Sequence, residues 1–477
     1  MVKKIYLGSS DFTEIVVSDG LLADKSLYIK DVIDSPDKVM LITRPRRWGK
    51  TLSQSMLQSF LSSEVNGIKT AGLFDNLAIA QVDDGSYIRE HQGKYPVIFI
   101  SFKDVKETTF DDCVNNLSIL MQKLFMQHEY LLESIAISDT NIKLFKQYLS
   151  GIQDAQYIAQ SIYFLSELLY SHYNNQKVYI LIDEYDTPLN EAYLSGYVDE
   201  LTKLMRNLFS SALKDNPNLQ KGILTGILRI SKDSMLSGLN NLEVYTILDE
   251  KYSEYFGFTN NELDKLFKEQ DLERDEDTVK SWYNGYNFVG TTIYNPWSIL
   301  SCLSKHGQFE AYWVNTSNNK LIEKLLLEFR GDVQPQMIKL MNNEAVEVTL
   351  DKYVSFDILS DNTASFWGLL LFSGYLTIAN ISSTGAGLLY TCTLRVPNVE
   401  IKSLLNHFYQ QWFYKCLREN YNSFLKNLTQ VGNVVKFSEQ LNEFLLESIS
   451  VRDTGVTSEK FYHGYNLQLM YINMWYT

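Results

Sequence analysis

Short runs of consecutive apolar residues alternate, through the first half of this chain, with longer stretches of helical spacing. Five runs have the length of buried strands, at 39–42, 96–102, 177–182, 222–227 and 243–248. Helical spacing separates them, at 27–33, at 52–61, from 113 to about 149 and from about 155 to 173. Apolar residues at successive positions are typical of strands covered on both faces. Strands that alternate with helices predict an α/β fold with a doubly wound parallel sheet.

The second half of the chain has a different pattern, which is mainly helical from about Tyr255 onward. Asn295 followed by Pro296 predicts a helix start, because asparagine caps helices well and proline fits the first helical position. The run 366–372 is apolar on every face and is expected to be buried. We therefore expect three parts, with limits at 1–250, 251–395 and 396–477.

Several aromatic residues of the second part allow two interpretations. They are Tyr283, Tyr286, Tyr312 and Trp313. Such side chains can form a recognition surface, but large aromatic residues pack in cores more often, and core packing is the favoured interpretation.

Composition and charge narrow the class of protein. The 477 residues are 45% hydrophobic and 21% charged, as in a globular protein, and the formal net charge is −14. That charge disfavours non-specific coating of nucleic acid, although a local basic groove stays open. No signal peptide or window of about 20 apolar residues is evident, so no membrane segment is expected. The four cysteines are far apart and form no C-x-x-C pair, which favours a reducing compartment, and the expected location is the cytoplasm.

The first apolar run leads into a sequence suited to phosphate binding. Gly49 allows close approach to the backbone, the following helix start offers free N–H groups, Lys50 adds a cation and Thr51 a hydroxyl for Mg²⁺. The usual pattern has a first glycine where this chain has Arg44. An ordinary capped helix is the alternative. Four basic residues cluster here in an acidic chain, and a bound phosphate would explain them: Arg44, Arg46, Arg47 and Lys50.

A second, independent signal is the apolar run that ends in two acids. Asp183 falls at the carboxyl end of its strand, where Mg²⁺ beside a phosphate loop would lie, and Glu184 follows where it could polarise a water. The alternative is that the acids only solvate the strand end. Thr225, inside the fourth run, could contact a γ-phosphate or could bond nearby backbone.

These motifs together resemble a known family, the bacterial and archaeal AAA-ATPase-like proteins whose phosphate loop reads R-P-R-R-F/W-G-K-T. The resemblance rests on the segments 43–51, 181–186, 224–232, 237–242, 282–286 and 294–298. In that family arginine is usual at the position of Arg44. The resemblance implies a P-loop NTPase sheet with flanking helices that binds ATP and Mg²⁺.

The resemblance also implies roles for individual residues. Gly49 and Lys50 would bind phosphate, Thr51 and Asp183 would hold Mg²⁺, and Glu184 would orient the attacking water. Arg206 and Arg229 become candidates for the arginine that contacts the γ-phosphate, with surface ion pairing as the alternative. The remaining nucleotide-site residues implied are Arg44, Arg46, Arg47, Trp48 and Thr225. Arg46 and Arg47 could equally face solvent.

Many proteins of this kind end in a PD-(D/E)xK nuclease-like domain. The segment 394–400 resembles its lead-in and 461–465 part of an early helix, but the strands that would carry metal ligands do not follow before Thr477, so a truncated remnant is expected. Glu400-Ile401-Lys402 spells E-x-K. We interpret it as a solvated first helical turn, because no strand with an acid precedes it.

The sequence thus predicts an ATP-binding, Mg²⁺-dependent ATP-hydrolysing switch. The alternatives are a nucleotide-dependent interaction module without turnover and, disfavoured here, a metal-dependent nuclease. A protein partner or self-association is expected beside the nucleotide, nucleic acid is left open, and no membrane contact is expected.

Overall fold

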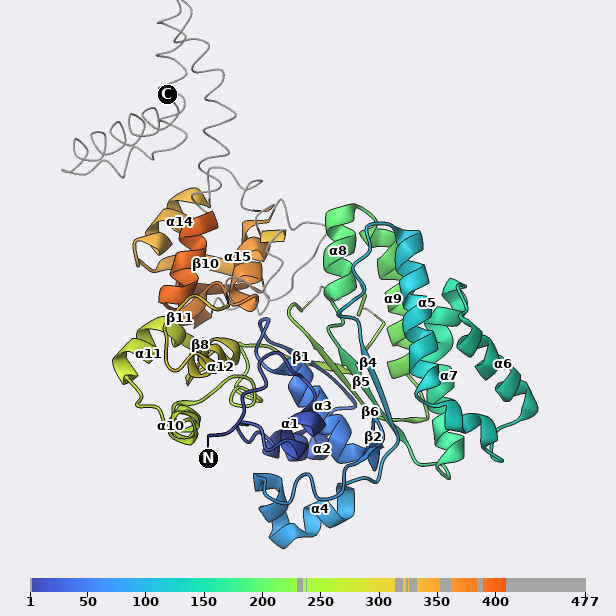
Figure 1. Ribbon diagram of the computed structural model, residues 1–477. Helices are drawn as coiled ribbons and strands as arrows, with labels where there is room; N and C mark the ends of the chain where they lie inside the picture. Colours follow the sequence, from blue (N-terminus) through green and yellow to red (C-terminus); the bar gives the residue numbers. More distant parts are fainter. Residues whose placement is uncertain are drawn as a thin grey trace, which may run out of the picture.

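The centre of the molecule is a five-stranded sheet in the order β4-β5-β6-β1-β7, and all of its pairings are parallel (Figure 1). The computed structural model describes residues 2–229, 235–236, 238–313, 321–322, 325, 333–351, 362–383 and 389–408. The strands are β1 (Val39–Thr43), β4 (Val97–Ser101), β5 (Val178–Asp183), β6 (Leu219–Gly226) and β7 (Leu242–Tyr245). Each overlaps one of the five predicted runs, so the expected α/β fold is confirmed.

Helices cover both faces of this sheet, because alternate residues of each strand point to opposite sides. In β1, Val39 and Leu41 join the core formed with α5, α7 and α9, whereas Met40 and Ile42 join the core formed with α1, α2 and α3. All four side chains have no exposed surface. The helices are α1 (Phe12–Val17), α2 (Leu27–Asp34), α3 (Lys50–Leu61), α5 (Phe110–Met126), α7 (Ala155–His172) and α9 (Val198–Leu213).

Smaller elements complete this first part at its margins. The helices α6 and α8 pack on α5 and α9, and η1 packs on α4. Their bounds are η1 (Ala78–Gly85), α4 (Ser86–His91), η2 (Glu129–Glu133), α6 (Asp139–Ser150) and α8 (Thr187–Ser195), with a hairpin of β2 (Glu64–Val65) and β3 (Ile68–Lys69).

The second part lies beyond the end of β1 and contains more strand than the sequence indicated. Its helices are α10 (Asn260–Glu269), α11 (Glu276–Tyr283), α12 (Pro296–Ser304), α14 (Gln334–Met341) and α15 (Thr363–Phe372). Its strands are the hairpin β8 (Tyr286–Phe288) and β9 (Thr291–Ile293) and the antiparallel set β10 (Val346–Asp351), β11 (Thr377–Ser383) and β12 (Leu389–Arg395). The apolar and polar residues of β10 alternate strictly, with its apolar residues buried, which is a strand signal that the sequence reading overlooked.

Three local predictions for this part are confirmed. The Asn295 side chain caps α12 by accepting from the backbone N–H groups of Trp297 and Ser298. The run 366–372 lies in α15 and is wholly buried. The four aromatic residues singled out are core residues, since Tyr283, Tyr286, Tyr312 and Trp313 are 0, 2, 8 and 1% exposed.

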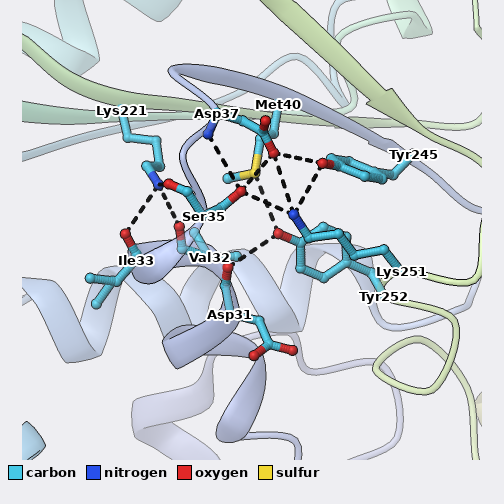
Figure 2. Close-up of polar contacts among 10 residues, drawn as sticks. All are labelled: Asp31, Val32, Ile33, Ser35, Asp37, Met40, Lys221, Tyr245, Lys251 and Tyr252. Carbon is cyan, nitrogen blue, oxygen red and sulfur yellow. Dashed lines mark hydrogen bonds and ion pairs between the residues drawn. The ribbon is translucent and has the colours of Figure 1, made fainter.

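A polar cluster fixes the end of β1 that lies away from the phosphate loop (Figure 2). The buried Lys221 side chain points at the carboxyl end of α2 and donates to the carbonyls of Val32, Ile33 and Ser35 at 2.7, 3.1 and 2.5 Å. Lys251 contacts Asp37 at 3.4 Å, and the Tyr245 hydroxyl donates to the same carboxylate at 2.6 Å. The last carbonyls of a helix have no intrahelical partners. Lys221 supplies hydrogen bonds to these carbonyls and so fixes the segment that connects α2 to β1.

Candidate nucleotide-binding site

The segment 44–49 joins β1 to α3 and leaves the amino end of that helix accessible. Gly49 is the N-cap residue with φ +81°, and a Cβ atom there would meet no heavy atom within 4 Å. The first turn of a helix carries N–H groups without intrahelical partners and the positive end of the helix dipole. The loop therefore presents an open, positively polarised cradle of the kind that binds phosphate.

Lys50 is held inside the loop that precedes it. Its ammonium group donates to the carbonyls of Arg44 and Pro45 at 3.0 and 2.9 Å, and the side chain is 3% exposed. Burial lowers the pKa of Lys50, and the nearby carboxylates of Glu184 and Asp183 oppose that shift. A cation satisfied only by carbonyls can exchange these partners for an anionic oxygen.

Asp183, at the end of β5, accepts hydrogen bonds from three hydroxyl groups of the site. Its Oδ2 atom accepts hydrogen bonds from the hydroxyls of Thr51 at 2.8 Å and Ser101 at 3.2 Å. Its Oδ1 atom accepts from the Thr225 hydroxyl at 2.7 Å. The carboxylate has no exposed surface, and burial, followed by the charge of Glu184, raises its pKa. The alternative that this acid merely solvates a strand end is therefore wrong.

Ser101 and Thr225 reach Asp183 for the same topological reason. Both occupy strands that flank β5, and the carboxyl ends of parallel strands meet at one edge of a sheet. The sequence reading missed Ser101, although its position as the last residue of a buried run was a usable signal. The suggestion that Thr225 bonds nearby backbone is wrong, because its hydroxyl donates to a carboxylate; its contact with a γ-phosphate stays a prediction.

Glu184 follows Asp183 in a left-handed conformation, with φ +54°. Its Oε2 atom accepts from the Thr187 hydroxyl at 2.6 Å. Burial by itself would raise the pKa of Glu184, but Lys50, the Thr187 hydrogen bond and Arg46 outweigh it and lower the pKa. The carboxylate is thus ionised at neutral pH and can accept a proton.

A cavity of about 430 Å³ opens in front of the loop, within the range of about 300–1,000 Å³ that small ligands occupy. The lining contains the residues 46–53 and Glu184, together with Lys103 and Lys106 from the segment after β4. Apolar and aromatic residues complete the lining, among them Leu21, Tyr255, Phe258, Trp297 and Leu300. The two lysines were not singled out from the sequence, since isolated surface lysines carry no signal without the fold.

Two residues expected to bind nucleotide have buried side chains, and of these only Trp48 is among the described residues that line the cavity. The Arg44 side chain has no exposed surface and donates to the carbonyls of Thr43, Tyr245 and Tyr252 at 2.8, 3.3 and 3.1 Å. Burial lowers the pKa of Arg44 to about 10, so it stays charged at neutral pH. Trp48 is 1% exposed and its ring centroid lies 4.7 Å from that of Tyr286. In this structure the Arg44 side chain supports the loop through these carbonyls, whereas Trp48 packs on Tyr286 at the margin of the cavity.

The other arginines differ in their distance from the cavity. Arg46 and Arg47 line it, and the Arg47 guanidinium lies 4.0 Å from the ring centroid of Trp297. Neither Arg206, on α9, nor the buried Arg229 is among the described residues that line it. Their contact with a γ-phosphate stays a prediction.

The segment before Arg229 is held by Asp186, the last residue of the acidic motif 181–186. Its Oδ2 atom accepts from the backbone N–H groups of Ile227 and Leu228, both at 2.9 Å. Burial, followed by the charge of Glu184, raises the pKa of Asp186 to about 6. The acidic motif after β5 thus also fixes the end of β6.

The E-x-K sequence does not lie on a solvated turn, so that interpretation is wrong. Glu400 has no exposed surface, and its two oxygens accept from the Trp313 backbone N–H at 2.6 Å and the Ser298 hydroxyl at 2.7 Å. Burial raises its pKa to about 7. No group of three or more His, Cys, Asp or Glu side chains within the described ranges could hold a metal ion. The segments 409–477 and 230–234 lie outside the described residues.

These features define an α/β protein with a P-loop NTPase-like fold. Residues 6–236, which include the loop, Asp183 and Glu184, match the model of the family described as Predicted AAA-ATPase, and this match agrees with the predicted resemblance to AAA-ATPase-like proteins. The family supports binding of a nucleotide, ATP. The chain is also 28% identical over 407 residues to the "Uncharacterized protein in vnfD 5'region" of Azotobacter chroococcum mcd 1, covering 85% of this chain and 69% of that protein. None of the helices described here has the length and hydrophobicity that crossing a bilayer demands.

Proposed function

We propose that this protein is a Mg²⁺-dependent ATPase whose site is the edge of the sheet between the phosphate loop and Glu184. The observation that carries the proposal is the 2.8 Å hydrogen bond from the Thr51 hydroxyl to Asp183. It joins the helix that would bind phosphate to the acid that would hold the metal. Neither the loop nor the acid alone distinguishes a nucleotide site from a capped helix or a polar strand end.

The oxygen atoms at this junction suit Mg²⁺. A carboxylate and hydroxyls are the hard ligands that this ion prefers, and it keeps waters and substrate phosphates as its other ligands. Thr51 and Asp183 would hold it, with Ser101 and Thr225 fixing the carboxylate. A single carboxylate suffices in such a site, which is compatible with the absence of a larger acidic cluster in the described part of the chain. When bound, the ion neutralises charge on the phosphates.

The remaining residues divide the work of hydrolysis. Lys50 leaves its two carbonyl partners to contact phosphate oxygens, and Gly49 lets the backbone N–H groups approach them. Glu184 is ionised and held by Thr187, so it can orient a water and take its proton. Arg46 and Lys106, which also line the cavity, add positive charge next to Glu184.

Binding and hydrolysis are separated by two variants. Binding of Mg²⁺-ATP and release of phosphate are measured for the parent, Lys50→Ala and Glu184→Gln. Lys50→Ala is expected to weaken binding about 10-fold or more, because a buried charge-assisted contact is lost. Glu184→Gln is expected to keep binding and to lose phosphate release, about 100-fold or more, because the base is removed.

Lys69→Ala is the matched control, since Lys69 is exposed in the β2–β3 hairpin and away from the cavity. If Lys50→Ala and Glu184→Gln bind ATP and release phosphate as the parent and Lys69→Ala do, the site is misassigned. Tight binding without any phosphate release by the parent would favour the nucleotide-dependent interaction module over the ATPase.

A further inference from the structure

The phosphate loop is bonded to the second part of the molecule through a tryptophan. The indole N–H of Trp313 donates to the Arg46 carbonyl at 3.1 Å. Trp313 is 1% exposed and packs edge-on against Tyr375, with ring centroids 5.2 Å apart. The indole therefore occupies one position, and the carbonyl of a loop residue is fixed against it.

The same tryptophan is bonded to Glu400. Its backbone N–H donates to Oε1 of Glu400 at 2.6 Å, and the Ser298 hydroxyl donates to Oε2 at 2.7 Å. Ser298 follows Trp297, whose ring lies under the Arg47 guanidinium. One oxygen of the Glu400 carboxylate thus bonds to Trp313, which contacts Arg46. The other bonds to Ser298, whose neighbour Trp297 contacts Arg47.

Glu400 also belongs to the last described helix. Residues 399–408 are helical, and the Asn398 side chain caps them by accepting from the Ile401 N–H at 3.0 Å. Phe408 of this helix packs on Tyr375 with ring centroids 6.3 Å apart. Polar and apolar contacts therefore run in parallel from the helix to the loop.

We propose that Glu400 is a positioning residue for the phosphate loop, acting through Trp313 on the Arg46 carbonyl, so that nucleotide occupancy and the helix 399–408 are energetically coupled. The inference rests on the proposed nucleotide site and adds its regulation. A buried carboxylate with two donors from different elements is costly to disturb, which makes it an effective link. Coupling between two sites is reciprocal, so a change at the helix alters nucleotide affinity, and nucleotide alters the helix.

Trp313→Phe tests the link, because it removes the indole N–H and keeps both the ring contact with Tyr375 and the backbone N–H to Glu400. Affinity for a non-hydrolysable ATP analogue with Mg²⁺ is expected to weaken about 3- to 10-fold, the effect of one hydrogen bond. Trp282→Phe is the control, since the Trp282 ring contacts Tyr283 and Phe309 away from the loop. Its affinity is expected to equal that of the parent.

Two substitutions at Glu400 test whether a conservative variant preserves the affinity that a non-polar variant loses. Glu400→Gln keeps an oxygen for the Trp313 N–H and an amide for the Ser298 hydroxyl, so affinity is expected to stay within about twofold of the parent. Glu400→Leu removes both acceptors and is expected to lower affinity at least as much as Trp313→Phe. If Glu400→Leu does not fold, Trp313→Phe and the exchange measurement decide the matter.

Hydrogen exchange of the segment 399–408 supplies a readout that packing alone would not change. The analogue with Mg²⁺ is expected to alter exchange of this segment in the parent and in Trp282→Phe, but not in Trp313→Phe. If the parent binds the analogue and Trp313→Phe matches it in affinity and in exchange, the coupling is overturned while the nucleotide site stands. If the parent binds no nucleotide, both proposals are overturned.

Discussion

The backbone of Gly257 lies so close to the indole ring of Trp48 that a Cβ atom there would come within 2.7 Å of its Cζ3 atom. The same Cβ would lie 2.0 Å from Cγ2 of Ile293, and the φ of Gly257 is +104°. Trp48 belongs to the phosphate loop and Ile293 to the β8–β9 hairpin. A position without a side chain is therefore what allows the loop to rest on the second part.

Gly257→Ala should destabilise the protein by about 2–4 kcal/mol, because it combines overpacking with backbone strain. It should also weaken nucleotide binding, since Trp48 must move. Urea unfolding and titration with a fluorescent ATP analogue would measure the two effects. Gly290→Ala is the matched control: Gly290 has φ +86° but open space around its Cβ position, so only about 1 kcal/mol of backbone strain is expected. Equal losses for both variants would show that contact with Trp48 is unimportant.

Asp183→Asn should separate stability from metal dependence. Burial and Glu184 raise the pKa of Asp183 in spite of the nearby Lys50, so the ionised group is unfavourable when no metal ion is bound. We expect the nucleotide-free variant to be at least as stable as the parent, because a buried charge next to Glu184 is removed while the amide still bonds to the surrounding hydroxyls. The increase in ATP affinity caused by Mg²⁺ should disappear. Calorimetric melting and ATP titrations with and without Mg²⁺ would check this, and a variant that is less stable yet keeps its Mg²⁺ response would contradict it.

Glu400→Gln should change the pH dependence of stability. The folded pKa of Glu400 is raised to about 7 from 4.5, so the folded state binds the proton more tightly than the unfolded state. The ionised group is therefore destabilising above pH 7, and this effect fades as the pH falls towards 4.5. The free energy of unfolding of the variant, relative to the parent, should rise by about 1–3 kcal/mol between pH 4.5 and pH 8.

The tyrosines that face Glu400 do not interfere with this measurement. Burial raises the pKa values of Tyr283 and Tyr286, and that of Tyr312 to about 12, so all three stay neutral across the range. Urea unfolding of both proteins at several pH values would give the difference directly. A difference that does not vary with pH would mean that Glu400 is not protonated on folding.

Lys221→Met should destabilise the protein without weakening the nucleotide site. The substitution keeps most of the side-chain volume but removes the donor to three carbonyls at the end of α2 (Figure 2). Leaving these acceptors unsatisfied should cost about 1–3 kcal/mol. ATP affinity at a temperature where the protein is folded should match the parent, because the cluster lies at the opposite end of β1. Lys177→Met, at an exposed position, is the control and should have little effect on either quantity.

The sequence by itself determined the sheet and indicated the residues that the fold gathers at its edge. The five runs became the five parallel strands, because strands covered on both faces need consecutive apolar residues; the fifth, β7, lies at the sheet edge and buries only Val244. Lys50, Thr51, Asp183 and Glu184 could be found because a phosphate loop and an acid-ended strand are local patterns with fixed spacing. Their closeness followed from parallel strands ending at one edge.

Only the tertiary structure decided which side chains face the cavity and which support it. Arg44 and Trp48 lie in the same short loop as Lys50, but long side chains on a turn can point either way, and the direction is set by packing against Phe256, Phe288 and Tyr286. Glu400 is remote in sequence from Trp313 and Arg46, so no local pattern could indicate their contact. The sequence suggested that Glu400 is a solvated acid at a helix start. In the structure it is a buried carboxylate that bonds to Trp313, the residue that contacts the phosphate loop.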